Sequence, residues 1–225
     1  MTMDFVRIDS GIPGLDEMLE GGFPFPSTIL IAGATGTGKT TFALQFLFAG
    51  ANLGEQGLFF TTFSEPTQWM LRFTSRYSFV NKEYLGKEIK YIDLGSMLKK
   101  QPHKLLEFIE DKIAEIMPQR IVIDPITVVD NLLNINYREF VYDLSASLKN
   151  WQAVTILTGE VKPGEDYPFD IAYTADGVIL LSNIEYEDGR RKYLEVLKMR
   201  GSDHMTGKHA VDLSKNGFSV QAGLR

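Results

Sequence analysis

The segment GATGTGKT, residues 33–40, has the residue types and the spacing of a phosphate-binding loop. It fits the pattern G-x-x-x-x-G-K-[ST], in which glycines let the backbone curl so that its N–H groups point inward around phosphate oxygens. Lys39 is expected to reach the β- and γ-phosphates, and the Thr40 hydroxyl is expected to bind Mg²⁺. A glycine turn with a solvated lysine is the alternative, which the position between a β-rich run and a helical run disfavours. The residues expected to bind the nucleotide at this loop are Gly33, Gly36, Thr37, Gly38, Lys39, Thr40 and Thr41.

A second metal candidate is Asp124, in the run RIVIDP at residues 120–125. The apolar residues predict a buried strand with Asp124 at its C-terminal end, which is where open α/β sheets bind ligands. A carboxylate there can hold Mg²⁺, usually through water. An Asp after an apolar strand is, taken alone, more often a helix cap or a turn residue. The presence of the phosphate loop in the same chain favours the metal role for Asp124. The predicted metal residues are therefore Thr40 and Asp124.

The rest of the chain alternates short β-rich runs with longer helical ones, which predicts βαβ units around a parallel sheet. Past residue 175, Asp188-Gly189 and Asn216-Gly217 are hairpin signals. The predicted fold is α/β, with a mostly parallel central sheet, helices on both faces and C-terminal antiparallel β-hairpins. Strands are expected at residues 27–33, 57–63, 89–94, 120–125 and 153–160, and helices at 39–54, 66–79, 102–117 and 137–151.

Composition narrows the class of protein. The 225 residues include 44% hydrophobic ones, have a net charge of −6 and contain no cysteine, so thiol chemistry and cysteine-based metal sites are excluded. The N-terminal residues lack the apolar region of a signal peptide, and no apolar run is long enough to cross a bilayer. We therefore expect one cytoplasmic domain over residues 1–225, without a membrane partner. The negative charge argues against non-specific nucleic-acid binding.

Several segments beyond the phosphate loop occur in a familiar order: GIPGLDEMLEGGFP at residues 11–24, QFLFAG, RIVIDP, TILTGE, ADGVILL and LEVLKMRGSDHMTG. Over roughly residues 5–220 the chain resembles the KaiC-like branch of the RecA superfamily of P-loop NTPases. The resemblance implies a single-domain KaiC-like ATPase with a RecA-type core. It also implies self-association into a ring, usually a homo-hexamer, with ATP and Mg²⁺ at each subunit interface.

In such a ring a neighbouring subunit reaches the γ-phosphate with basic residues, and the matching residues here are Lys198 and Arg200. Because strand side chains alternate, Leu194, Val196, Lys198 and Arg200 are expected to share one face, so that two charges project together. Cations there could neutralise charge on the transferred phosphoryl group. Protection of a sheet edge is the alternative role of these cations. The resemblance implies further nucleotide contacts from Met199, Ser202, His204 and Ser214.

The general base departs from the family pattern. Relatives usually carry two adjacent glutamates after the second strand, where this chain has Ser64-Glu65. Glu65 is expected to point away from the place that Ser64 fills unless the strand bends before Pro66. Losing a general base costs about 10²–10⁴-fold in rate, so we expect ATP binding with slow hydrolysis. A surface or interface carboxylate is the alternative for Glu65. The expected catalytic residues are Lys39, Glu65, Lys198 and Arg200.

DNA-binding relatives grip DNA with two loops that face the ring channel. Here residues 128–136 contain no Lys or Arg, and residues 159–170 set Lys162 against four carboxylates. These loops would repel a phosphate backbone, so DNA binding is not expected. The run GRRK at residues 189–192 is interpreted as a solvated turn.

Three functions remain open on the sequence. The first is a slow ATPase whose nucleotide sets the state of an oligomer that signals to protein partners. The second is a nucleotide-stabilised scaffold without significant turnover. The third, a DNA-dependent recombination or repair ATPase, is disfavoured by the acidic loops.

Overall fold

A computed structural model describes residues 6–62, 72, 74–133 and 137–223. The helices described are α1 (Leu15–Met18), α2 (Lys39–Asn52), α4 (Gly95–Lys100), α5 (Leu105–Ile116), α6 (Asp130–Leu133), α7 (Tyr137–Asn150) and α8 (Phe169–Thr174). The strands are β1 (Arg7–Ile8), β2 (Phe23–Pro24), β3 (Ser27–Gly33), β4 (Gly57–Thr61), β5 (Ile89–Asp93), β6 (Arg120–Asp124), β7 (Val154–Glu160), β8 (Gly177–Tyr186), β9 (Gly189–Met199), β10 (Lys208–Ser214) and β11 (Gly217–Val220).

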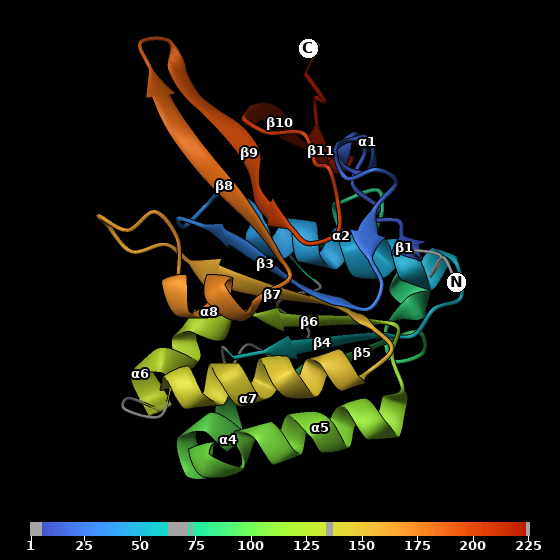
Figure 1. Cartoon of the computed structure of the whole chain (residues 1–225). Helices are drawn as coiled ribbons and strands as arrows, with labels where there is room; N and C mark the ends of the chain where they lie inside the picture. The colour runs from blue at the N-terminus through green and yellow to red at the C-terminus, as the bar shows by residue number, and fades with distance from the viewer. Residues whose placement is uncertain (1–5, 63–71, 73, 134–136, 224–225) are drawn as a thin grey trace, which may run out of the picture.

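Nine strands form one sheet in the order β11-β10-β9-β8-β3-β7-β6-β4-β5 (Figure 1). The strands from β8 to β5 in this order run parallel to their neighbours, whereas β9, β10 and β11 add antiparallel pairs at the β8 edge. The short strands β1 and β2 pair with each other, outside this sheet. The predicted class, α/β with a mostly parallel sheet and C-terminal antiparallel hairpins, is confirmed.

The sheet is covered on both faces, as the sequence predicted (Figure 1). Alternate side chains of β3 point to opposite faces. Ile29 and Ile31 join a core with α2, whereas Leu30 and Ala32 join a second core with α5 and α7. Because β3 is apolar on both faces, it lies inside the sheet and ends in the phosphate loop.

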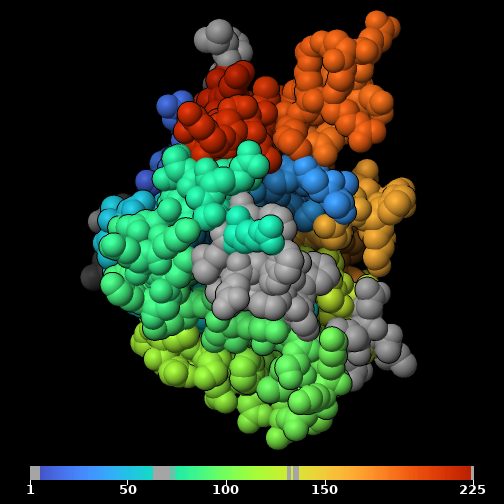
Figure 2. Space-filling view, turned by 180° about the vertical axis from the view of Figure 1, so that it is seen from behind, coloured from blue at the N-terminus to red at the C-terminus, as the bar shows by residue number. Residues whose placement is uncertain are grey.

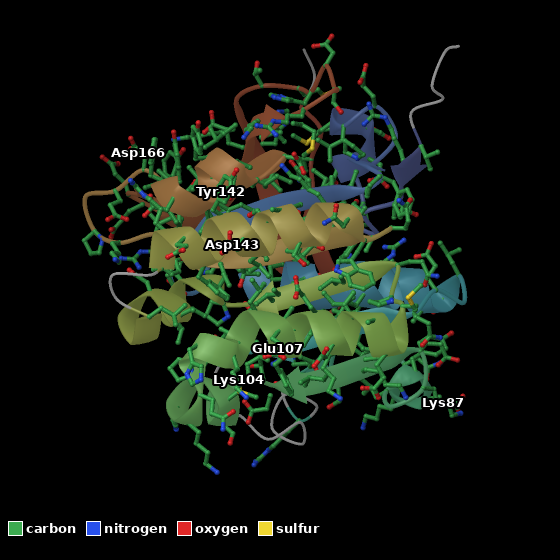
Figure 3. All side chains as sticks on the ribbon, turned by 60° about the horizontal axis from the view of Figure 1, so that its bottom comes forward. Lys87, Lys104, Glu107, Tyr142, Asp143 and Asp166 are labelled. Carbon is green, nitrogen blue, oxygen red and sulfur yellow. The ribbon has the colours of Figure 1, made fainter. Side chains whose placement is uncertain are left out.

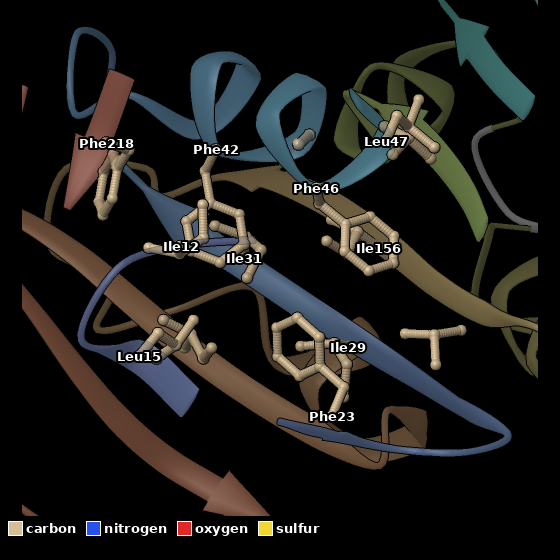
Figure 4. Packing of buried hydrophobic residues seen from close by; sticks show 14 of the residues in the cluster. Ile12, Leu15, Phe23, Ile29, Ile31, Phe42, Phe46, Leu47, Ile156 and Phe218 are labelled. Atoms are coloured by element: carbon tan, nitrogen blue, oxygen red, sulfur yellow. The ribbon is translucent and has the colours of Figure 1, made fainter. Parts of the chain in front are cut away.

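The core on the α2 face fixes the start of that helix. In Figure 4, Phe42 and Phe46 of α2 point down onto Ile29 and Ile31 of β3. Phe218 of β11 meets Phe42 edge to face, with ring centroids 5.4 Å apart. The C-terminal hairpin is therefore packed directly over the first turns of the helix that follows the phosphate loop.

Helices α5 and α7 cover the other face and carry their charges on the solvent side. Figure 3 shows Glu107 of α5 and Asp143 of α7 on this outer surface. Leu105, Ile109 and Ile113, at helical spacing along α5, are buried instead. This helical layer packs against the sheet that carries the phosphate loop, and its residues do not belong to the loop.

A buried arginine connects the N-terminal segment to the sheet. Arg120, at the start of β6, is 1% exposed and pairs with Glu55 at 2.5 Å. Its guanidinium also donates to the carbonyls of Asp9 and Phe46, and it lies 4.6 Å from the Phe46 ring centroid. An arginine this deep is tolerated because carbonyls, a carboxylate and a ring replace its water.

Some element boundaries differ from the predicted ones. Half of the predicted helix 66–79 lies outside the described residues, and residues 75–79 form turns instead of continuing the helix. The hairpin turns are Glu187–Asp188 and Lys215–Asn216, one residue earlier than predicted, because Gly189 and Gly217 open the following strands with positive φ.

Candidate nucleotide-binding site

The phosphate loop lies between the end of β3 and the start of α2, as predicted. It borders a cavity of about 440 Å³, which is large enough for a small-molecule ligand. The loop needs glycine at residue 38, where φ is +106° and an added Cβ would lie 3.2 Å from the Phe218 ring. The cavity is lined at the loop by Thr35, Gly36, Gly38, Lys39, Thr40 and Thr41, and on its other sides by Phe59, Thr61, Tyr91, Asp124, Pro125, Glu160 and Leu213.

Lys39 is buried, with 7% of its side chain exposed. Its ammonium donates to the carbonyls of Gly33 and Ala34 at 2.7 and 3.0 Å, and to Glu160 Oε1 at 3.0 Å. Glu160 Oε2 also accepts from the Thr35 hydroxyl at 3.3 Å. The lysine expected to bind phosphates is thus held by a carboxylate of the neighbouring strand β7.

Thr40 and Asp124, the two predicted metal residues, lie together. The Thr40 hydroxyl donates to Asp124 Oδ2 at 2.8 Å, and the Thr158 hydroxyl donates to Oδ1. Burial raises the pKa of Asp124, whereas the hydrogen bonds from Thr158 and Thr40 and the charge of Lys39 oppose that rise. A buried carboxylate beside a hydroxyl is an all-oxygen donor pair that suits Mg²⁺, which takes one or two protein oxygens and completes its shell with phosphates and water. These residues fit the metal.

Lys198 and Arg200 lie at the other end of β3, away from the phosphate loop. The backbone N–H of Arg200 donates to Asp176, whose own N–H donates to Thr28. Thr28 is five residues before Gly33 on β3, which corresponds to about 16 Å along a strand. Arg200 therefore cannot contact a phosphate held by the loop of its own chain.

The prediction that Leu194, Val196, Lys198 and Arg200 share one face is wrong. Leu197 is an extra residue opposite the Val178–Ile179 step of β8, so the alternation reverses there. Met199, rather than Lys198, returns to the core beside Leu194 and Val196. Strand β9 ends at Met199, and Arg200 belongs to the turn that follows.

Both cations have partners in their own chain. The Lys198 ammonium donates to the carbonyls of Ala172 and Ala175, at 3.2 and 2.5 Å, at the C-terminal end of α8. Burial and the neighbouring Arg200 lower the pKa of Lys198. Arg200, with 56% of its side chain exposed, pairs with Asp176 at 3.0 Å. Arg200 is the cation that is freer to reach another molecule.

Ser202, His204 and Ser214 do not form one group. The Ser202 hydroxyl accepts from Arg7 at 2.8 Å. His204 is partly buried, and its Nδ1 has no hydrogen-bond partner among the described residues. Ser214 lies on the other hairpin, next to Leu213, which borders the phosphate loop of the same chain. The structure therefore places Ser214 beside its own loop, whereas Ser202 and His204 follow Arg200.

A family model described as "ATPase: KaiC" matches residues 8–225. The chain belongs to the KaiC ATPase family. The match confirms the predicted resemblance to KaiC-like ATPases of the RecA superfamily.

Individual relatives agree with this assignment. A circadian clock oscillator protein KaiC from Prochlorococcus marinus is 30% identical over 99% of this chain and 46% of the relative, so the chain spans about half the length of the KaiC proteins it matches. A UPF0273 protein from Thermotoga maritima is 27% identical over 95% of each chain. The crystal structure of a KaiC-like protein from Pyrococcus horikoshii has a TM-score of 0.87, with 33% identity over 96% of this chain and 99% of that one. That structural match also supports the RecA-like fold.

Ser64 and Glu65, the predicted base position, lie outside the described residues. Thr41, the last predicted loop residue, faces the Tyr77 hydroxyl at 3.5 Å, which places an aromatic ring beside the first turn of α2.

Two contacts in this KaiC domain differ from what the sequence predicts. Glu160 is expected from the sequence only as one of the acidic charges of residues 159–170, but the parallel register Gly33↔Glu160 places it beside the phosphate loop. The sequence signal was its position at the C-terminal end of a strand. The interpretation of residues 189–192 as a solvated turn is wrong at Lys192, which is half-buried and donates to the carbonyl of Gly36.

The cations beside the two acidic loops, residues 128–136 and 159–170, are paired with carboxylates of these loops. Lys162 pairs with Asp130 at 3.3 Å, and Arg138 of α7 pairs with Asp170 at 2.6 Å. These cations are neutralised locally, while Asp166 stands at the outer end of its loop (Figure 3). Within the ranges described, no helix is both long and apolar enough to cross a membrane.

Proposed function

We propose that this KaiC-family chain binds Mg·ATP and assembles into a homo-oligomeric ring, a homo-hexamer by family resemblance, with each nucleotide at a subunit interface. The observation that supports the interface is the separation of the two halves of the site. The phosphate loop and the Thr40–Asp124 pair lie at one end of β3, and Arg200 lies at the other. A second subunit can bring its Arg200 to this loop, whereas the same chain cannot.

The residues have separate tasks in this proposal. The amides of residues 33–40 and the Lys39 ammonium bind the phosphates, while Thr40 and Asp124 hold Mg²⁺, which neutralises charge on the β- and γ-phosphates when it is bound. Lys39 exchanges its contact with Glu160 for the phosphates. Arg200 of the neighbour exchanges Asp176 for the γ-phosphate, with Lys198 beside it.

Hydrolysis is proposed to be slow, because Ser64 fills the place of the usual first glutamate. Glu65 is the remaining candidate base. The ring would then persist in its ATP state and present a surface that protein partners read, in the cytoplasm. This regulatory role follows from slow turnover combined with assembly.

The assembly is tested by measuring the molar mass of the purified protein by light scattering, with and without Mg·ATP. We expect a larger species with Mg·ATP, and none with Lys39→Ala. Arg200→Ala should still bind nucleotide but assemble weakly. A protein that stays monomeric with Mg·ATP bound would contradict the interface, and one that binds no Mg·ATP would contradict the whole proposal.

A scaffold without turnover is the second candidate. Among the described residues, the carboxylates of the site are Asp124 and Glu160, which already accept hydrogen bonds from Thr40 and Lys39. Neither is placed as a free general base, which favours the scaffold. Phosphate release separates the two functions. Release above the Lys39→Ala background that Glu65→Gln abolishes indicates a slow ATPase, and release equal to that background indicates the scaffold.

A further inference from the structure

Lys192 connects the β8–β9 hairpin to the phosphate loop. Its ammonium donates to the carbonyl oxygen of Gly36 at 2.5 Å and to Asn183 Oδ1 at 3.1 Å. Asn183 is the cross-strand partner of Lys192, so the two side chains start from adjacent positions on the hairpin. Figure 2 shows the orange β8–β9 hairpin directly above the blue surface of the segment that includes the phosphate loop and the start of α2.

Gly36 is a weakly constrained part of that loop. Its φ is +79°, and apart from its two chain neighbours no heavy atom of the described residues lies within 4 Å of the place where a Cβ would be. Gly36 therefore has no packing on that side, and glycine permits several backbone conformations, so a hydrogen bond to its carbonyl can select among them. Among the described residues, Lys192 is the side chain that donates to the Gly36 carbonyl.

The orientation of this peptide matters for phosphate binding. In a trans peptide the carbonyl and the N–H point in opposite directions, so holding the Gly36 carbonyl toward Lys192 turns the Thr37 N–H the other way, into the loop. That N–H donates to the Ala34 carbonyl at 3.4 Å, a long contact that a phosphate oxygen can replace. An ammonium on the carbonyl also strengthens the dipole that the N–H presents to an anion.

Lys192 has no competing anion in the part of the chain that the structure describes. No carboxylate lies within ion-pair distance of it, in contrast to Lys39, which is paired with Glu160. Burial lowers the pKa of Lys192. The charged form of a partly desolvated cation that is held by neutral oxygens is stabilised by the negative charge of a triphosphate bound nearby.

We propose that Lys192 is a positioning residue, which holds the Gly36–Thr37 peptide with its N–H toward the phosphates of a bound nucleotide. Lys192 acts through the loop backbone. The inference rests on the proposed function, because it assumes that the loop binds Mg·ATP. It also makes the affinity for phosphates depend on the β8–β9 hairpin, through Asn183 and Lys192.

The test compares Lys192→Met, Lys192→Arg and Asn183→Ala with a matched control, Arg190→Met, which removes one positive charge from the same strand two residues away. Affinities for Mg·ATP and Mg·ADP are measured by titration with fluorescent nucleotide analogues. We expect Lys192→Met to weaken both about tenfold, the effect of one charged hydrogen bond. Lys192→Arg should keep most of the affinity of the original protein, and Asn183→Ala should lower the affinity a few-fold. Arg190→Met should bind both nucleotides with the affinity of the original protein.

A second measurement needs no nucleotide. Amide hydrogen exchange over residues 34–38 of the free protein should be faster in Lys192→Met than in the original chain, with exchange in α2 unchanged. Unchanged exchange and unchanged affinity would overturn the proposal. So would a loss of affinity that accompanies a lower Tm and is not rescued by arginine. Absence of Mg·ATP binding by the original chain would instead refute the proposed function, and the exchange result would still decide the loop contact.

Discussion

The pair between Lys39 and Glu160 leads to a prediction about nucleotide affinity. Phosphates and Glu160 compete for the same ammonium, which is 7% exposed and has its other contacts only to carbonyls. Glu160→Gln keeps the shape of the side chain and removes its charge. The free protein should then lose stability, because Lys39 is left without a counter-charge, and the nucleotide should bind more tightly.

The size of the effect follows from the exposure of the pair. A hydrogen bond to a charged group contributes about 1.5–3 kcal/mol. Glu160 is 41% exposed, so solvent screening reduces its contribution toward the lower end. We expect the free energy of unfolding of the free protein to fall by roughly 1.5 kcal/mol, and the affinity for Mg·ATP to rise about tenfold.

Calorimetric titration with a non-hydrolysable ATP analogue and urea unfolding of the free protein measure the two quantities. Glu165→Gln is the control, because it removes the same charge from an exposed position on the loop that follows β7. Tighter binding with lower stability agrees with competition. Weaker binding by Glu160→Gln would refute it, and would show that Glu160 contacts the bound nucleotide or its metal instead.

Three further outcomes are expected. Burial raises the pKa of Asp16 to about 6. Because the folded state then holds this proton at a pH where the unfolded state has lost it, this group makes stability fall as pH rises from about 4 to 6. The full shift corresponds to about 3 kcal/mol by pH 7, which solvent screening of this partly exposed group reduces to on the order of 2 kcal/mol. Asp16→Asn should remove that loss in urea unfolding compared with the original chain. Asp124→Asn should reduce the tightening of ATP binding by Mg²⁺ about tenfold, in titrations with Mg²⁺ and with EDTA. Phe218→Ala should lower the free energy of unfolding by about 3–5 kcal/mol, because a buried ring against Phe42 and Gly38 is lost.

The predicted positions of the phosphate loop and of Asp124 agree with the structure, because these positions follow from local sequence. The loop at residues 33–40 and Asp124 each end a continuous apolar strand, and parallel strands bring their C-terminal ends to the same edge. Thr40 and Asp124 therefore had to lie close together. The sheet class followed in the same way from alternating β and helical runs.

The parts that were mispredicted depend on distant residues. Strict alternation placed Lys198 on the apolar face of β9, but the extra Leu197 reverses it, and a bulge has no signal in one strand read alone. Lys192 belongs to a basic run that looks solvated, and only the pairing of β8 with both β3 and β9 brings it to Gly36.

The packing of β11 on the phosphate loop also bears on how the molecule is made. Gln45 of α2 donates to the carbonyl of Phe218, a contact between residues separated by 173 positions. On the ribosome, the glycine-rich segment emerges long before the aromatic ring that covers it. A nascent chain therefore carries the nucleotide motif without the packing that shapes it until residue 218 has also been synthesised and released from the ribosome.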